Sequence, residues 1–345
     1  MLSSLPSIHI LVGCPTEELL ETSKDEILLS NEYGKNEGVS EIVKVLHSLG
    51  YSSIQIHSVT LNNYNQIFQK LGQQSNFVVL NLCDGTETDG YPGISIVTYL
   101  EQKGWPYTGA NPYFFDITNS KPIMKKILME NKVSTSPFVE IDNLEEAKTK
   151  ISKLENTISY PMFIKPSISY ASICISDNSV VTNQCEALGQ LEQVLSQTNG
   201  GVFIEKFLEG REFTALVSGD ATQGIVVYDV AERVFNKNLK ANQRILAFDR
   251  YWAGYDLNGN APDEKERLYT YEPASPLLMD RLKELAKNAY LSLKGNGYGR
   301  VDIRSDSMDY STMKLYVLEI LRLSKVSPSD FMDSLIHFAM KRAKK

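Results

Sequence analysis

The sequence predicts an α/β protein of two or three domains, and three observations support this fold class. Apolar strand-like runs alternate with segments of helical periodicity along the chain. The length of 345 residues exceeds the usual size of one domain, which is about 150 residues. Hydrophobic residues make up 42% of the chain and charged residues 22%, which is ordinary globular usage and argues against disorder, collagen and a coiled coil.

The first predicted unit opens with an apolar run at residues 8–12, which is typical of a strand and too short for a signal-peptide core. Apolar residues spaced by one and two helical turns predict a helix over 39–49, and Gly50 stands where a C′ glycine ends a helix. The run FVVLNL at 77–82 predicts a buried strand. A polar, glycine-bearing loop follows at its carboxyl end, where open α/β sheets place ligands. A helix over about 92–103 and a short strand over about 105–108 complete the unit.

Two further units follow without an internal repeat or a low-complexity linker, so we expect the units to pack against each other around a cleft. In the second unit we expect helices over 120–131, 144–155 and about 184–197, and extended segments over 133–141, 160–166, 170–176 and 201–207. In the third unit we expect strands over 212–219, 224–235, 298–305 and 314–320, an aromatic-rich loop over 247–262, a helix over about 276–294 and a terminal helix from about residue 328.

Charge and composition exclude several classes of function. The chain has 35 Lys and Arg against 42 Asp and Glu, and a net charge of −7 disfavours binding to a phosphate backbone by counterion release. A transmembrane helix needs a run of about 18 uncharged apolar residues, and no stretch of this sequence approaches that length. Free thiols are favoured over zinc or disulfides because the cysteines show no CxxC spacing, and we therefore expect a cytoplasmic protein. The cysteines are Cys14, Cys83, Cys174 and Cys185.

Two predicted C-terminal strands carry a candidate metal site. Arg300 and Asp302 are two residues apart, so they project from the same strand face, and Glu319 sits likewise between apolar neighbours. If the strands pair as an antiparallel hairpin, two carboxylates and a guanidinium converge on one face. Mg²⁺ is commonly held by one or two carboxylates together with substrate phosphates. A salt bridge among alternating surface residues is an equally good interpretation of this spacing.

Three other charged residues are candidates for nucleotide contacts. Lys165 is a lone cation in an apolar strand, so it requires an anionic partner, which in a nucleotide enzyme is a phosphate. Seen alone, an edge lysine with its ammonium in solvent is the simpler interpretation. Glu205 and Glu212 could accept hydrogen bonds from an adenine amino group and a ribose hydroxyl, although each alone is an ordinary solvated acid. The motifs of P-loop, Rossmann, zincin and α/β-hydrolase sites do not occur.

Several motifs, in order, resemble the ATP-grasp superfamily, and specifically its D-alanine–D-alanine ligase group. They extend from about residue 81 to residue 320 and comprise NLCDGTETDG with YTGAN downstream, SKPIMKKIL, YPMFIKPSISYASI, VFIEKFLEGREFTALV, GYGRVDIR and YVLEI. The resemblance implies an α/β (α+β) ATP-grasp fold of three subdomains, with the nucleotide cleft between the central and C-terminal ones. The implied ranges are 1–115 for an N-terminal domain, 116–209 for the central subdomain and 210–345 for the C-terminal subdomain.

The resemblance also assigns roles to individual residues, with ATP and Mg²⁺, or alternatively Mn²⁺, as cofactors. Lys121 and Lys165 match the lysines that hold ATP phosphates. The hinge strand that contacts adenine is matched by Glu205, Lys206 and Leu208, and the ribose contact by Glu212. Asp302 and Glu319 match the metal ligands, and Arg300 matches the arginine that stabilises the developing oxyanion.

The implied activity is that of a carbon–nitrogen bond-forming ligase. ATP phosphorylates an amino-acid carboxylate to an acylphosphate and ADP, and a second molecule's amine then attacks to form a peptide bond. The expected partners are small-molecule amino acids or a related carboxylate and amine, without nucleic acid or membrane, and a homodimer is compatible with the family. The alternative is an ATP-binding ATP-grasp protein with impaired catalysis.

The chain departs from the family pattern mainly on the substrate side. Family members carry Asn two residues after the Glu matched by Glu319, followed by a Gly- and Ser-bearing loop, whereas here Leu321 occupies that position and about twenty residues of the loop are absent. A truncated isoform, a decayed enzyme and a loop left out of the numbering are all open interpretations. Three further segments differ from the family pattern. The loop that covers the phosphates reads SISYAS at 167–172. Glu17 or Glu18 could orient the first substrate, and Arg244 or Arg250 could replace the lysine of the family's central loop.

Overall fold

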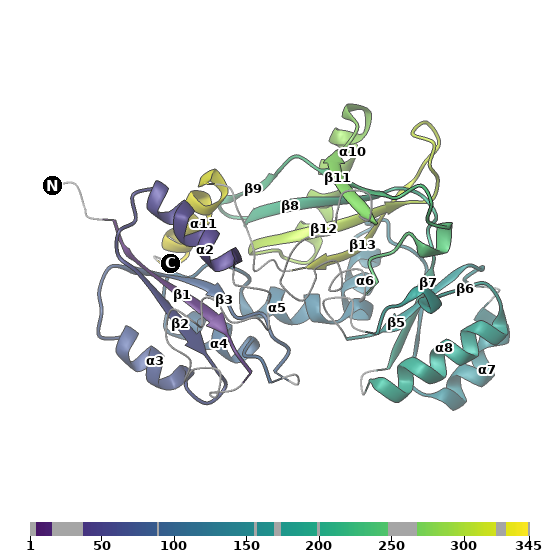
Figure 1. Cartoon of the computed structure of the whole chain (residues 1–345), viewed down its shortest axis with the longest axis horizontal. Coiled ribbons are helices and arrows are strands. Elements are labelled where there is room, and N and C mark those ends of the chain that lie inside the picture. Colours follow the sequence, from purple (N-terminus) through teal and green to yellow (C-terminus); the bar gives the residue numbers. More distant parts are fainter. Residues whose placement is uncertain are drawn as a thin grey trace.

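The computed structural model describes residues 5–15, 37–87, 90–154, 157–168, 174–198, 201–247, 268–321 and 329–343 (Figure 1). Three sheets organise the described chain, and their strands lie within residues 7–82, 138–206 and 212–321. None of the helices in these ranges has the length and hydropathy needed to span a bilayer.

The N-terminal sheet is parallel, with strand order β2-β1-β3. Helices α2 and α11 lie on one side of this sheet and α3 and α4 on the other, so both faces of β1 are buried (Figure 1). The predicted first strand, helix and buried strand are confirmed, but the strand expected over 105–108 is a single bridge between Val79 and Tyr107. The elements are β1 (Ser7–Gly13), α2 (Glu37–Ser48), β2 (Ile54–Val59), α3 (Tyr64–Leu71), β3 (Phe77–Leu82), α4 (Ile94–Gln102) and the C-terminal α11 (Ser329–Arg342).

The central sheet is antiparallel, with strand order β4-β7-β5-β6. Apolar side chains alternate along β5 and β7 and pack under two helices, which leaves Lys165 and Glu205 on the opposite face. The strand expected over 170–176 is wrong at residues 174–176, which lie outside any strand and lead into a short 3₁₀ helix. The elements are β4 (Phe138–Ile141), α7 (Leu144–Leu154), β5 (Met162–Pro166), β6 (Val180–Val181), α8 (Gln184–Gln197) and β7 (Val202–Lys206).

The C-terminal sheet has six antiparallel strands in the order β11-β10-β8-β12-β13, with β9 pairing β8. Helix α10 (Pro276–Ser292) covers its apolar face, so the opposite face presents the charged side chains. The single strand predicted over 224–235 is divided into β9 and β10, which pair different parts of β8. Between them the Tyr228 amide still donates to the Leu216 carbonyl, and the Val230 carbonyl accepts from the Ala274 amide. The strands are β8 (Glu212–Asp220), β9 (Gly224–Val227), β10 (Ala231–Phe235), β11 (Tyr269–Pro273), β12 (Gly297–Ser305) and β13 (Leu315–Leu321).

Helices α5 (Pro112–Asn119) and α6 (Lys121–Glu130) connect the N-terminal sheet to the other two, and α6 lies between the central and C-terminal sheets (Figure 1). The chain after α6 contacts β13 directly, since the Thr135 hydroxyl donates to the Val317 carbonyl at 2.7 Å. The Lys121 amide donates to the Ser167 carbonyl just after β5. Helix α6 therefore places its side chains against both sheets.

Candidate active site

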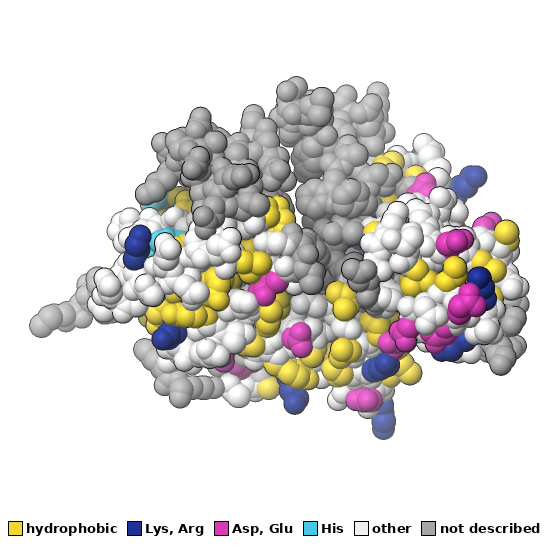
Figure 2. Space-filling model, turned by 90° about the horizontal axis from the view of Figure 1, so that it is seen from below, with side chains coloured by type: hydrophobic (Ala, Val, Ile, Leu, Met, Phe, Trp, Pro, Cys, Tyr) yellow, Lys and Arg dark blue, Asp and Glu magenta, His cyan; other side chains and the backbone are white. Residues whose placement is uncertain are grey.

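Charged side chains that are mostly buried gather between the central and C-terminal sheets. On the outer surface, by contrast, acidic and basic groups are interspersed in solvent over the end formed by α7 and α8 (Figure 2), where exposed pairs contribute little stability. We call the buried group the charge cluster. Its described members are Lys121, Lys125, Lys165, Glu205, Glu212, Arg233, Arg300, Asp302, Arg304 and Glu319.

The central-sheet side of the charge cluster is built around Glu205. Its Oε1 lies 2.6 Å from the Lys165 ammonium, and its Oε2 contacts the Lys125 ammonium and the Ser136 hydroxyl. These side chains are at most 5% exposed. Burial opposes ionisation of Glu205, but the two ammonium groups lower its pKa to about 2. Glu205 is therefore an ionised carboxylate enclosed by cations.

Lys121 lies at the start of α6, between this pair and the C-terminal sheet. Its ammonium is 3.9 Å from the Glu319 carboxylate, and Lys165 is a further electrostatic neighbour. Burial lowers the pKa of Lys121 to about 8, an effect that Glu319 opposes and Lys165 reinforces. An added anion near Lys121 would favour its charged form.

On the C-terminal sheet, Glu212 of β8 lies between arginines of the two neighbouring strands. Register pairs it with Arg233 of β10 and with Arg304 of β12. Arg233 contacts Glu212 Oε1, and Arg304 Nη1 donates to Oε2 at 3.0 Å. Arg304 also stacks over the Phe207 ring at 4.8 Å. Both oxygens of the predicted ribose contact are thus already hydrogen-bonded.

The hairpin expected for β12 and β13 is confirmed, and its register places Asp302 opposite Glu319. Arg300 donates to both oxygens of Asp302, from Nε at 2.9 Å and Nη2 at 3.0 Å, and the Thr214 hydroxyl donates at 2.8 Å. Arg300 and Asp302 therefore form the ion pair of the salt-bridge interpretation, but Asp302 is buried instead of lying on the surface. Burial disfavours a charged Arg300, but Asp302 raises its pKa.

A register shift in this hairpin sets which side chains face the charge cluster. The shift follows Asp302, so β13 contains one residue more than β12 at that point. As a result Val317 and Ile320 both pack in the core although they are three residues apart, while Glu319 is paired with Asp302. The same register puts Leu321 directly opposite Arg300.

The described residues fit a polyanion bound with a divalent cation. The charge cluster holds six cationic and four acidic groups, a positive excess that suits phosphates. Arg304 Nε is buried and has no hydrogen-bond partner in the described structure. For a metal, the described ranges contain no group of three or more His, Cys, Asp or Glu side chains. Asp302 and Glu319 could hold Mg²⁺ together with substrate phosphates, since Mg²⁺ needs only one or two carboxylates in such sites.

The predicted hinge residues point in different directions. The Lys206 ammonium turns away from Glu205 and donates to the Tyr160 carbonyl at 2.9 Å, while its backbone amide donates to the Pro137 carbonyl. Leu208 is buried at 6% exposure. Arg244 contributes its carbonyl to Arg304 Nη2 at 2.8 Å. Arg250, Glu17, Glu18 and most of the SISYAS loop lie outside the described residues.

Sequence reasoning missed three cations of the charge cluster. Lys125 follows Lys121 by one helical turn, which is a usable signal for a shared helix face. Arg304 follows Arg300 and Asp302 with the period of two that marks one strand face. Arg233 has no local signal, because its partner Glu212 lies on another strand.

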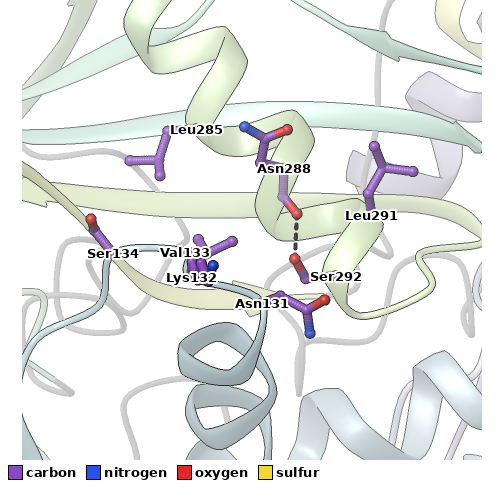
Figure 3. A pocket seen from close by; sticks show the side chains of 8 residues that line it. All are labelled: Asn131, Lys132, Val133, Ser134, Leu285, Asn288, Leu291 and Ser292. Atoms are coloured by element: carbon purple, nitrogen blue, oxygen red, sulfur yellow. Dashed lines mark hydrogen bonds between the residues drawn. The ribbon is translucent and has the colours of Figure 1, made fainter.

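A polar pocket of about 370 Å³ lies at the other end of α6 from Lys121 (Figure 3). It lies between the loop after α6 and the last turns of α10, where the Ser292 hydroxyl bonds to the Asn288 carbonyl. Its lining residues are Asn131, Lys132, Val133, Ser134, Leu285, Asn288, Leu291 and Ser292. None of these residues belongs to the charge cluster.

The fold and this site define an ATP-grasp protein, as the resemblance predicted. Solved structures share the fold: a D-alanine–D-alanine ligase from Bacillus anthracis complexed with ATP matches with a TM-score of 0.62 at 18% identity, covering 98% of this chain and 99% of that one. VanG D-Ala:D-Ser ligase from Enterococcus faecalis matches with a TM-score of 0.64 at 15% identity, covering 97% and 100%.

The sequence comparisons specify the family. The family model described as D-ala D-ala ligase C-terminus matches residues 127–320, more than half of the chain, and the chain belongs to that family. Among curated relatives, D-alanine–D-alanine ligase A of Bacillus cereus is 25% identical over 286 residues, which is 83% of this chain and 84% of the relative. The predicted family resemblance and fold class are confirmed.

Proposed function

We propose that this protein is an ATP- and Mg²⁺-dependent carboxylate–amine ligase that activates an amino-acid carboxylate as an acylphosphate and joins it to a second amine. The charge cluster carries this proposal, because it combines excess positive charge with the paired carboxylates Asp302 and Glu319. Membership of the D-alanine–D-alanine ligase family supports the reaction class. The names of its relatives support D-alanine, or another small amino acid, as substrate.

In this mechanism the charged side chains position and neutralise phosphates. The ammonium groups of Lys121 and Lys165 would bind phosphate oxygens, at a site where burial strengthens each interaction. Asp302 and Glu319 would hold Mg²⁺, which supplies charge neutralisation between the transferring phosphates. Arg300 would donate to the oxyanion that develops when the amine attacks. Its partly exposed position, at 23%, leaves it accessible to substrate.

The residue paired with Arg300, which is Leu321, supports a second candidate function, an ATP-binding protein with impaired catalysis. Leu321 stands there in place of the family's Asn, so its side chain offers no oxygen to a metal. Two carboxylates without a third protein ligand would bind Mg²⁺ more weakly, while the nucleotide contacts remain. Under either candidate function, four statements remain predictions: the residue roles, the three domain ranges, the cytoplasmic location and the homodimer.

The test is amino-acid-dependent turnover. The chain is incubated with ATP, Mg²⁺ and pairs from a panel of D- and L-amino acids, and ADP, phosphate and dipeptide are measured. The ligase proposal predicts ADP release that requires an amino acid, and loss of that release in Lys165→Ala. Normal ATP binding without release for any pair would support the second candidate. Grafting an Asn-containing family loop after Ile320 should then restore turnover if only that segment limits the enzyme.

A further inference from the structure

The polar pocket at the end of α6 is separate from the charge cluster (Figure 3). Residues 131–134, which follow α6, form one wall, and the last turns of α10 form the other. Its volume of about 370 Å³ lies within the range of cavities that bind small molecules. The side chains that line it therefore determine which ligand it can take.

The polar groups of this lining are available to a ligand. The Lys132 ammonium, the Ser134 hydroxyl and the Asn288 amide make no hydrogen bond or ion pair with any residue in the described ranges. Among the lining residues, Figure 3 shows a hydrogen bond only from the Ser292 hydroxyl to the Asn288 carbonyl. None of the described lining side chains is acidic. Lys132 therefore has no carboxylate of the described chain as its counter-charge.

The two walls of the pocket differ in charge. Helices α6 and α10 both end here, and a helix C-terminus carries about −0.5 elementary charge. On the first wall Lys132 outweighs the end of α6. On the second wall the end of α10 has no lysine among the described lining residues, because the Lys294 ammonium lies over the Tyr113 ring instead, 5.3 Å from its centroid. A ligand with one positive and one negative group matches these walls better than a simple anion or cation.

Aliphatic side chains form the rest of the lining. Val133 is buried, Leu285 is half-buried, and Leu291 is 38% exposed although it is a large apolar residue. An apolar ligand group seated on Leu291 would remove this surface from water, which contributes about 25 cal/mol per Å². The lining therefore combines separated charges with an apolar surface.

We propose that this pocket is a second ligand site, which binds a free aliphatic amino acid in its zwitterionic form. The carboxylate pairs with Lys132, the ammonium group lies at the end of α10, and the aliphatic side chain contacts Leu291. Ser134 and Asn288 supply further hydrogen bonds to the two charged groups. The site shares no described residue with the charge cluster, so it is independent of the proposed ligase activity.

The first test titrates the wild-type chain with leucine of either chirality. Isoamylamine and isocaproate serve as matched controls, since each keeps the aliphatic chain of leucine but lacks one of its two charged groups. Methyl-labelled Val133, Leu285 and Leu291 report binding at the pocket itself by NMR. At least one enantiomer of leucine should shift these methyl resonances and bind about fivefold or more tightly than either control. No shift with either enantiomer, or equal affinity for leucine and a control, would overturn the proposal.

The second test removes the lysine of the pocket. Lys132 and Lys294 both follow a helix with positive φ, at 60° and 51°, but only Lys132 lines the pocket among the described residues. Lys132→Met should weaken leucine binding by about fivefold or more, whereas Lys294→Met should bind leucine as the wild-type chain does. Urea unfolding verifies that both variants are folded. Equal leucine affinity in the two variants would overturn the assignment of the carboxylate to Lys132 and the proposal with it.

Discussion

Leu321 of β13 lies directly opposite Arg300 of β12, one position beyond the paired carboxylates Asp302 and Glu319. Opposed residues of an antiparallel pair share a sheet face. In the family pattern Asn occupies the Leu321 position, and we propose that a third metal ligand would be added there. If Asp302 and Glu319 hold the metal as proposed, an aliphatic residue at this position would weaken metal binding without removing the nucleotide contacts. Substituting this position is therefore informative.

We expect Leu321→Asn to strengthen Mg²⁺ binding, because the amide oxygen adds a ligand beside Asp302 and Glu319. Changes in the immediate surroundings of metal sites commonly alter affinity by about 10–100-fold, and we expect the lower end of that range. The measurement is ADP binding or turnover as a function of Mg²⁺ concentration. Leu321→Val is the matched control. An identical Mg²⁺ dependence for both variants would show that this position does not face the metal.

The affinity for ADP should decrease as pH rises through about 8. Lys121 has a lowered pKa of about 8 in the free protein, so above that pH it must take up a proton before it can pair with phosphate. Calorimetry in buffers of different ionisation enthalpy should detect proton uptake on binding. Lys121→Met should abolish that uptake. Proton release on binding by the wild-type chain would contradict the assignment.

Stability should depend on Glu205 at acid pH. Its folded pKa of about 2 lies below the ordinary value of 4.5, so its contribution is present above 4.5 and is lost as pH falls toward 2. At neutral pH, Glu205→Gln should reduce the free energy of unfolding by about 3–5 kcal/mol, since two ammonium groups lose their carboxylate. Urea unfolding measures both effects. The charge-balanced Lys125→Met/Glu205→Gln should lose less than Glu205→Gln alone; an equal loss would argue against the pairing.

The N-terminal and C-terminal sheets should depend on Arg342 for their attachment. Its guanidinium donates to the carbonyls of Tyr107 and Gly109 and to Asn296 Oδ1, and it stacks on the Tyr107 ring at 3.6 Å. Arg342→Ala should lower the free energy of unfolding by about 1–3 kcal/mol, because three partly buried acceptors lose their donor. Lys341→Ala, which changes an exposed neighbour, should have little effect. Equal stability of the two variants would contradict this role.

Local patterns predicted much of the fold and part of the site. The period of two along β12 placed Arg300 and Asp302 on one face, and their contact follows from that spacing. Long-range pairing was not predictable in the same way. Glu205 meets Lys125 across eighty positions of sequence, so no local signal distinguished this buried ion pair from an ordinary solvated acid. The division of 224–235 into β9 and β10 likewise depends on long-range pairing, since both strands pair β8 and Val230 between them accepts from the Ala274 amide.

The central claim is that the charge cluster between the two sheets binds ATP, and the affinity of the chain for Mg-ADP before and after Lys165→Ala tests it most directly. Calorimetry should show binding by the wild-type chain and a loss of about tenfold or more in the variant, because a buried charged hydrogen bond to phosphate contributes about 1.5–3 kcal/mol. Unchanged affinity in a folded Lys165→Ala protein would contradict the account.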